Sequence, residues 1–223
     1  MAVEIVFLKS IPYFSKLSPD ELNSVKELVF EKKVERGDII VLEGEPAEAL
    51  YFVGTGAVKM FRTSIDGKEQ VLNIVRPGDS FNDVPIFDGS PNLASAQAMG
   101  PVSLYGILKH DLIAFLQEHP RIAINIVNVL AAQVRHLVSL VEDLSFRPVV
   151  GRVAKTLLEY AGDGTGLGQR LTQQDMAAIA GTAREVVSRS LRVLESDGVI
   201  RMDRHRIVIT DIGALKDVAG VST

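Results

Sequence analysis

Between Pro120 and Pro148 the sequence contains neither proline nor glycine, and this uninterrupted stretch constrains the fold more than any other feature. Its apolar residues recur at helical spacing, so we expect one helix of about 25 residues over 120–144. Two apolar stripes run side by side along it, and such a helix must be covered from two directions. We expect the chain's own domain to cover one stripe and a second copy to cover the other; a core helix in a monomer is the alternative. The stripe assigned to the second copy consists of Ile124, Val127, Ala131, Val134, Val138 and Val141, and the neighbouring stripe of Ala123, Leu130, Leu137 and Leu144.

The region before this helix has a different texture. Residues 32–108 consist of short runs of Val, Ile, Leu, Phe and Tyr separated by glycines about every 7–12 residues, which is typical of antiparallel strands in a sandwich or barrel. Asp66-Gly67 predicts a hairpin turn between two of these runs. Upstream, Ser18 followed by Pro19 and Glu21 predicts the start of a helix with a capping box.

The region after Pro148 contains a pair of short predicted helices. Residues 172–194 read TQQDMAAIAGTAREVVSRSLRVL, and two helices joined by a glycine-containing turn form a helix-turn-helix. We expect Thr172 to cap the first helix and Thr182 to cap the second, which spans about 182–195. The second helix presents one polar, mostly basic face, formed by Arg184, Glu185, Ser188, Arg189 and Arg192.

A recognition helix needs polar side chains near its start, because these residues reach the base edges in the major groove. Arginine binds guanine O6 and N7 with two hydrogen bonds, and glutamate accepts from cytosine N4. Glu185 has the alternative role of a helix-capping acid. Residues 198–210 predict a two-stranded wing in which Arg204 contacts phosphate, so Thr172, Thr182 and Arg204 complete the set expected at DNA.

The charges are unevenly distributed. The 223 residues carry a net charge of −4, which by itself argues against a nucleic-acid partner. Residues 148–223 hold 10 Lys and Arg against 9 Asp and Glu, a net charge of +1, whereas residues 1–147 have −5. The charges therefore fit an acidic sensor domain joined to a locally basic domain, and such a chain is compatible with binding to double-stranded DNA.

The composition also limits the chemistry. The chain has no cysteine, which excludes disulfides, Cys-ligated iron–sulfur clusters and thiol switches. The N-terminus lacks the pattern of a signal peptide, so we expect a cytoplasmic protein that does not enter the membrane. An enzyme of the cupin type would need histidine ligands, and residues 31–108 contain none, so we expect neither an enzyme nor a metal site.

Residues 181–211, GTAREVVSRSLRVLESDGVIRMDRHRIVITD, resemble the winged-helix signature of the cyclic AMP receptor protein and fumarate–nitrate regulator (CRP/FNR) superfamily of bacterial transcription regulators. RGDIIVLEGEPAEALYFVGTGAVKMF resembles that family's cyclic-nucleotide-binding β-roll. The resemblance implies an α+β fold with a jelly-roll sensor domain (1–119), a dimerisation helix and hinge (120–147) and a winged helix-turn-helix domain (148–223). It further implies a homodimer on a palindromic site, and RNA polymerase as partner if the protein activates.

The base-reading positions match two branches of the family. Arg184, Glu185 and Arg189 match the cyclic AMP receptor branch, and Glu185, Ser188 and Arg189 match the fumarate–nitrate branch. The resemblance therefore implies half-sites similar to TGTGA or TTGAT.

The effector segment departs from the family pattern. Leu93 and Ala94 stand where nucleotide-binding members have Arg and Ser or Thr, and Asn82 replaces a glycine beside Asp83. A cyclic phosphate would lose its guanidinium partner there, and burying an uncompensated anion is costly. We therefore expect a non-nucleotide effector or none, with Asn82, Asp83, Leu93 and Ala94 lining the pocket and Asp83 either binding a hydroxyl or serving as a turn acid.

Haem is one candidate cofactor. Residues 92–98 resemble a segment of haem-associated, nitric-oxide-responsive relatives, which makes a sensor of nitric oxide or CO the alternative function. Its axial ligand would come from His110, His119, His136 or His205, or from a group other than histidine, although His136 and His205 are expected to be solvated. A ligand-binding module whose helix-turn-helix has no DNA function is a more remote alternative.

Overall fold

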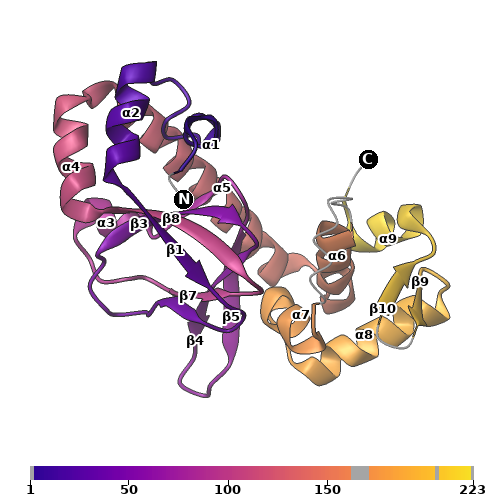
Figure 1. Ribbon diagram of the computed structural model, residues 1–223. Helices are drawn as coiled ribbons and strands as arrows, with labels where there is room; N and C mark the ends of the chain where they lie inside the picture. The colour runs from indigo at the N-terminus through magenta and orange to yellow at the C-terminus, as the bar shows by residue number, and fades with distance from the viewer. Residues whose placement is uncertain (1–2, 162–170, 204–205, 222–223) are drawn as a thin grey trace. The chain divides into compact units, whose positions relative to one another are not determined.

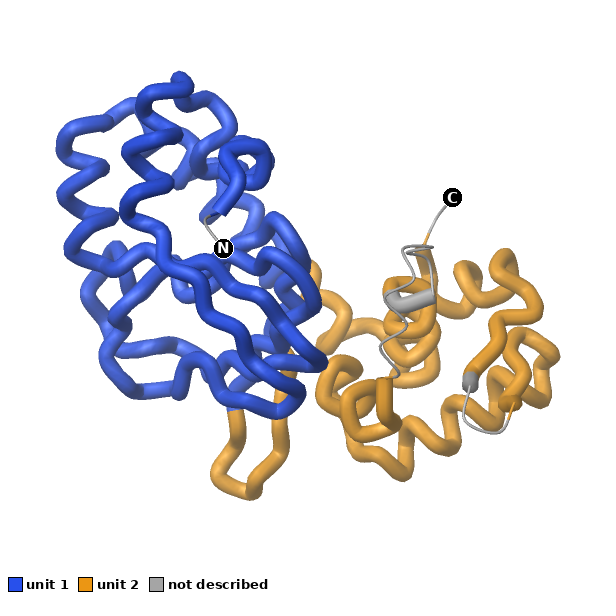
Figure 2. Tube along the Cα trace, viewed as in Figure 1, with its two compact units in different colours: residues 1–62, 72–137 blue, residues 63–71, 138–223 orange. Residues whose placement is uncertain are grey.

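The structure is a computed structural model that describes residues 3–161, 171–203 and 206–221. The chain divides into two compact units (Figure 2): residues 1–62 with 72–137, and residues 63–71 with 138–223. Both units combine helices with antiparallel sheets, so the fold class is α+β, as the sequence predicts. We describe each unit by itself.

The first unit contains a β-roll of two four-stranded antiparallel sheets (Figure 1), with strand orders β1-β8-β3-β6 and β2-β7-β4-β5. Apolar residues of both sheets, including Val53, Val58, Ala96 and Leu104, are buried between them. The strands are β1 (Val29–Val34), β2 (Ile39–Val41), β3 (Ala49–Thr55), β4 (Val58–Thr63), β5 (Glu69–Val75), β6 (Ser80–Phe81), β7 (Ser95–Ala98) and β8 (Val102–Leu108). The jelly-roll prediction is confirmed.

The turn between β4 and β5 lies at the predicted Asp66-Gly67. Gly67 has a φ of +76°, a left-handed conformation that glycine adopts without steric cost. Its amide donates to the carbonyl of Ser64 at 2.9 Å, and the amide of Ser64 donates to the carbonyl of Lys68 at 2.8 Å. The predicted hairpin is therefore correct.

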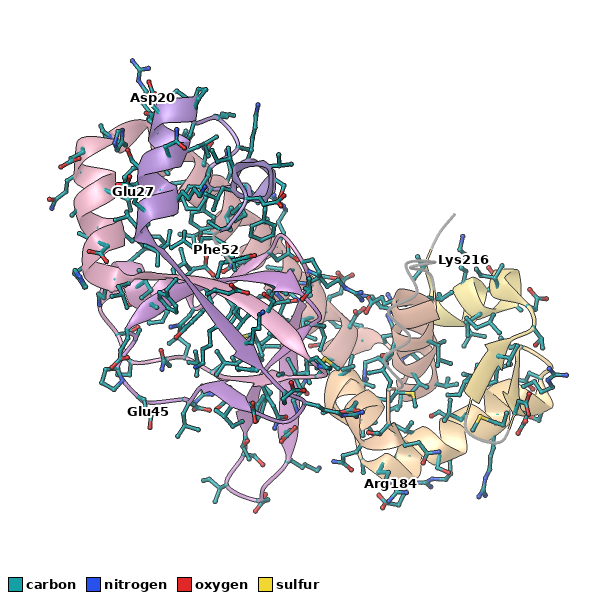
Figure 3. All side chains as sticks on the ribbon, in the orientation of Figure 1. Asp20, Glu27, Glu45, Phe52, Arg184 and Lys216 are labelled. Carbon is teal, nitrogen blue, oxygen red and sulfur yellow. The ribbon has the colours of Figure 1, made fainter. Side chains whose placement is uncertain are left out.

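Helices cover the outer face of the β1-β8-β3-β6 sheet. They are α1 (Ile5–Ser10), α2 (Pro19–Leu28), α3 (Asp83–Asp88), α4 (Lys109–Glu118), a 3₁₀ turn (Pro120–Ile122) and the first half of α5 (Ala123–Phe146). Leu22, Leu112 and Ile122 from these helices belong to one buried cluster with Phe52 of β3, which Figure 3 labels inside the unit. The predicted capping box of α2 is present: the Ser18 hydroxyl accepts from the Glu21 amide, and the Ser18 amide donates to the Glu21 carboxylate.

The long helix is the predicted one, with its α-helical part extending to Phe146. We call the stripe assigned to a second copy the seam, and five of its residues are between 56% and 63% exposed in the single chain: Ile124, Val127, Val134, Val138 and Val141. Ala131 is half-buried. The seam therefore lacks a partner within the described part of the chain.

The neighbouring stripe was predicted only partly correctly: Leu130 packs against the β-roll as expected, but Ala123 is exposed. The β-roll covers Ile126, Val129 and Leu130 of α5, together with the buried Asn125, whose amide donates to the carbonyl of Tyr13 at 3.1 Å. Leu137 and Leu144 stay largely exposed. The covering helices contact only the first half of α5, and a straight helix drifts around its axis relative to a seven-residue repeat.

The segment 120–146 is long and apolar enough to cross a bilayer when only length and composition are considered, and it is the one such helix among the described residues. Its surface is not apolar on all sides, however. Gln133, Arg135 and His136 lie in its middle, and Ile126 belongs to the core of the β-roll. The helix is therefore amphipathic, with one polar face and one packed face, which is typical of a surface helix in a globular protein.

The second unit contains a winged helix-turn-helix. Its elements are α6 (Val149–Ala161), α7 (Gln173–Ala180), α8 (Arg184–Ser196), β9 (Ile200–Asp203), β10 (Arg206–Ile209) and α9 (Ile212–Ala219). Val153 of α6, Met176 of α7, Leu191 of α8 and Leu215 of α9 meet in one buried cluster. The predicted pair of helices and its two-stranded wing are confirmed.

Candidate functional site

The turn between α7 and α8 fixes the direction of the second helix. Gly181 ends α7 in the left-handed region with a φ of +60°, and the next amide, that of Thr182, donates to the carbonyl of Ala177 at 2.9 Å. This bond makes Thr182 part of the turn, so α8 begins two residues later, at Arg184, with Ala183 at its N-cap. The prediction that Thr182 caps α8, with Glu185 as its partner acid, is wrong.

Thr172 has the predicted role at the start of α7. Its hydroxyl oxygen accepts from the amide of Asp175 at 3.1 Å, while the Asp175 carboxylate accepts from the amide of Thr172 at 2.9 Å. These reciprocal bonds satisfy two of the amides that a helix start leaves open. They fix the first helix, against which the recognition helix packs.

A residue that the sequence analysis missed fixes the other end of α7. The guanidinium of Arg152, on α6, donates to the carbonyl of Ala180 at 2.6 Å and to that of Arg147 at 2.7 Å. Carbonyls at a helix C-terminus lack partners within the helix, and a cation there also compensates the helix dipole. Arg152 therefore stabilises the turn from which α8 starts, and no local motif marks this long-range contact in the sequence.

Helix α8 has two distinct faces. Val187, Leu191 and Leu194 are buried in the core of the unit. On the other face Arg184, Glu185, Arg189 and Arg192 are exposed and Ser188 is half-buried; Figure 3 labels Arg184 where it projects from the surface. The structure thus brings the predicted base-reading residues onto one side of one helix.

This polar face lines a hollow of about 360 Å³. Its lining consists of Gln173, Arg184, Glu185, Ser188, Arg189 and Arg192. Gln173, the first residue of α7, was not predicted. Three guanidinium groups around an exposed hollow at the beginning of a helix suit the phosphates and base edges of a duplex.

The wing follows directly after α8. Strands β9 and β10 pair antiparallel, with Met202 opposite Ile207, and the exposed Arg201 lies on β9. The amide of Met202 donates to the Glu195 carboxylate at 2.8 Å, which connects the wing to the end of α8. The predicted phosphate contact Arg204, like His205, lies outside the described residues.

An ion-pair cluster joins the end of α5 to α6 within the second unit. Asp143 accepts from Arg147 at 2.8 Å and from Lys155. Burial opposes ionisation of Asp143, but the bonds from Lys155 and Arg147 outweigh it and hold the pKa of this carboxyl below its usual value. The cluster therefore depends on an ionised Asp143.

The first unit contains a cavity of about 150 Å³. All four predicted pocket residues line it: Asn82, Asp83, Leu93 and Ala94. The sequence analysis missed eleven further lining residues, among them Met60, Leu72, Phe81, Gln133, His136 and Leu137. The last three are on α5, so the wall of the cavity is built partly from the helix that carries the seam.

Asp83 is held by three donors and is only 3% exposed. Its Oδ1 accepts from the hydroxyls of Tyr13 and of Ser80, the latter at 2.7 Å, and its Oδ2 accepts from the Gln133 amide at 3.0 Å. Burial, together with the charge of Asp83, raises the pKa of Tyr13 far above its usual value, so this phenol stays a donor. Asp83 therefore joins three segments around the cavity and is more than a turn acid.

Asn82 occupies a position where the family pattern has glycine, and its backbone adopts a conformation that glycine favours. It has a φ of +70°, which makes it the one described residue other than glycine with a positive φ. Asparagine tolerates this left-handed conformation better than other residues with a side chain. Its amide donates to the carbonyl of Ala49 at 3.1 Å, which fixes the segment against β3.

The histidines give little support to a haem site. His110 is exposed beside Asp111, and His119 lies 3.2 Å from the Glu21 carboxylate. His136 is exposed, as predicted, and it also lines the cavity, with Nε2 3.1 Å from the carbonyl oxygen of Leu72. The cavity measures about 150 Å³, which is the size that holds benzene and smaller than the pockets of drug-sized ligands.

Comparisons with known proteins agree with this geometry. Residues 31–119 match the family model of the cyclic nucleotide-binding domain, and residues 151–218 match that of the Crp-like helix-turn-helix domain. The chain is 31% identical over 212 residues to the cyclic AMP receptor protein of Thermus thermophilus, covering 95% of this chain and 98% of that protein.

Two further relatives share most of their length with the chain. The CRP-like cAMP-activated global transcriptional regulator of Mycobacterium tuberculosis is 31% identical over 205 residues, which cover 89% of this chain and 92% of that protein. The structure of FixK2 from Bradyrhizobium japonicum superimposes with a TM-score of 0.75 at 25% identity, covering 87% of this chain and 99% of that one.

Proposed function

Since the chain belongs to the CRP/FNR superfamily of DNA-binding transcription regulators, we propose that it binds a palindromic operator as a homodimer and responds to an effector other than cyclic AMP. The observation that carries the proposal is the basic face of α8, with Arg184, Arg189 and Arg192 around one exposed hollow. A regulator of this kind acts in the cytoplasm, where the DNA is.

The base sequence of each operator half-site is inferred from the side chains at the start of α8. Arg189 binds a guanine through O6 and N7, and Glu185 accepts from a cytosine N4 on the opposite strand. Arg184 and Ser188 distinguish the two candidate sequences, because Arg184 belongs to the pattern for TGTGA and Ser188 to that for TTGAT. Thr172, Gln173 and Arg192 contact the flanking phosphates.

The homodimer rests on the seam. Its five large residues are more than half exposed, and a contiguous apolar stripe on a long helix is typical of a helix–helix interface. A two-fold interface of this kind pairs each residue with its own counterpart or a near neighbour. The two recognition helices then enter successive major grooves about one helical turn, roughly 34 Å, apart.

The proposed exclusion of cyclic AMP rests on the lining of the cavity. Among the described residues that line it there is neither lysine nor arginine, and the acidic Asp83 is buried in its wall. A cyclic phosphate placed there would have no lysine or arginine to compensate its charge. The Thermus thermophilus relative is named for cyclic AMP, so in this respect the proposal separates the two proteins.

Fluorescence anisotropy with labelled duplexes tests the function. The full chain is titrated, at physiological salt, onto a palindrome of TGTGA half-sites, a palindrome of TTGAT half-sites and a scrambled duplex of the same composition. We expect one palindrome to bind at least 100-fold more tightly than the scrambled duplex, within the range of specific DNA-binding proteins. Equal binding to all three duplexes contradicts the proposal.

Isothermal titration with cyclic AMP tests the exclusion. We expect no saturable heat at millimolar nucleotide. A stoichiometric site with micromolar affinity would show that the cavity opens to a nucleotide, and the chain would then be a cyclic AMP receptor like its relatives.

A further inference from the structure

The cavity of the first unit has a definite size and a definite chemistry, and these specify a ligand class. We propose that it binds a neutral molecule of about the size of one aromatic ring, with an apolar body and a single hydrogen-bond donor directed at Oδ2 of Asp83. This inference rests on the proposed role of the cavity as the effector site, but its binding test does not require DNA.

The size sets the first limit. The cavity measures about 150 Å³, and an engineered protein cavity of that volume holds benzene. Pockets for drug-sized ligands begin at about 300 Å³. The part of the ligand that the cavity holds is therefore a ring or a short hydrocarbon chain.

The walls set the second limit. Apolar side chains such as Met60, Leu72, Phe81, Leu93 and Leu137 form most of the lining. Most polar groups of the wall already have hydrogen-bond partners within the protein. The Asn82 amide donates to the carbonyl of Ala49, and a ring nitrogen of His136 lies against the carbonyl of Leu72. With Asp83 present and neither lysine nor arginine in the lining, an anionic ligand is disfavoured on both counts.

The remaining acceptor sets the third limit. A carboxylate has about four lone-pair positions. Tyr13 and Ser80 occupy the two positions of Oδ1, whereas Gln133 occupies one position of Oδ2. One acceptor position of Oδ2 is left, on a residue that lines the cavity. A hydroxyl or N–H of the ligand satisfies it, next to the amide of Gln133.

Three matched ring compounds test each limit on the full chain. Phenol carries a donor, toluene replaces it with a methyl group of similar size, and benzoate adds a negative charge; affinities come from saturation-transfer NMR titrations. In a purely apolar cavity phenol binds more weakly than toluene, because a buried hydroxyl without a partner is costly. We expect phenol to bind at least as tightly as toluene and benzoate at least tenfold more weakly than either.

Cavity-filling variants locate the binding. Ala94→Leu fills the space from the buried side and Leu93→Trp fills it from the half-exposed rim, where a larger side chain does not disturb the core. We expect either variant to weaken phenol binding at least tenfold. The control Ile39→Ala, which changes an exposed apolar residue of β2 that is not part of the lining, leaves it unchanged. Circular dichroism identifies any variant that fails to fold.

The outcomes separate this inference from the proposed function. Toluene binding tighter than phenol, benzoate binding comparable to either, or phenol binding that both folded filling variants retain would each overturn the inference. If the chain then still prefers its palindrome over scrambled DNA, the regulator function stands. If phenol binds as expected but no duplex is preferred, the proposed function fails while the assignment of the ligand class holds.

Discussion

The amide of Gln133 donates a hydrogen bond to the carboxylate of Asp83 at 3.0 Å, so the first residue of α3 is fixed to the long helix α5. Both partners line the cavity. A ligand there lies against both ends of this bond, which gives the cavity a direct physical connection to the helix that carries the seam. Coupling between effector binding and DNA binding requires a structural element that has two alternative arrangements. The bond between Gln133 and Asp83 is the candidate for this element.

The buried bond between Tyr13 and Asp83 predicts a specific loss of stability. Tyr13→Phe removes one hydroxyl donor from a carboxylate and keeps the ring that packs on Phe14 and Phe52. We expect the free energy of unfolding to fall by about 1.5–3 kcal/mol, the usual range for a hydrogen bond to a charged group. Urea unfolding followed by circular dichroism measures it. The matched control is Tyr51→Phe, on a half-buried ring that stacks on Phe81, and equal losses in both variants would contradict the role of the bond.

The Asp143 cluster predicts a pH-dependent contribution to stability. Because the folded-state pKa of Asp143 lies below the usual value of 3.8, its contribution is complete above that value and is lost as the pH falls through the folded-state pKa. Asp143→Asn should therefore destabilise the chain by about 1 kcal/mol at pH 7, below the usual range for charged hydrogen bonds because Lys155 and Arg147 remain partly hydrated. The difference from the unmodified chain should shrink below pH 4.

Urea titrations at pH 7 and pH 3 check this expectation. Glu142→Gln, one residue earlier and exposed, is the control with the same charge change. A deficit of Asp143→Asn that stays constant between the two pH values would show that the cluster does not depend on ionisation of Asp143.

The exposed seam predicts the effect of a charge on assembly. Val134 is 59% exposed in the single chain, and Val134→Glu would place two carboxylates against each other in the proposed dimer. We expect monomers in light scattering and at least a tenfold loss of palindrome affinity. Ala132→Glu puts the same charge on another exposed position of α5, away from the seam, and should leave the dimer intact. If Val134→Glu remains dimeric at micromolar concentration, the seam is not the interface.

Two arginines should differ in what they contribute to DNA binding. Arg189→Ala should cost about 1–3 kcal/mol on the preferred palindrome and relax the preference at one guanine, because its guanidinium reads a base. Arg201→Ala, in the wing, should weaken specific and scrambled duplexes alike, because it contacts phosphate. Anisotropy titrations of both variants on both duplexes distinguish the two roles, and equal profiles would contradict the assignment.

Hydrophobic periodicity and short motifs were sufficient to predict most of the fold. The glycine spacing predicted the β-roll, the stretch without proline or glycine predicted α5, and the cap at Thr172 predicted the start of α7. These features are local, so a single sequence contains them. The resemblance to one family then placed the four pocket residues around one cavity.

The errors arose where two segments compete for the same backbone group or where partners are distant in sequence. Thr182 has the residue type of a helix cap, but its amide closes the turn after α7. Gln133 and Asp83 are 50 positions apart, as are many partners in a roll, and no local pattern marks their bond. Arg152 caps a helix that begins 21 residues later and was missed for the same reason.

The exposed seam also has a consequence for how the protein responds to its own abundance. In the proposed dimer an operator is recognised only by two chains together, so at concentrations below the dimerisation constant occupancy rises with the square of the chain concentration. A modest change in synthesis or degradation then produces a larger change in transcription. In this regime the expression level of the regulator acts as a second input beside its ligand.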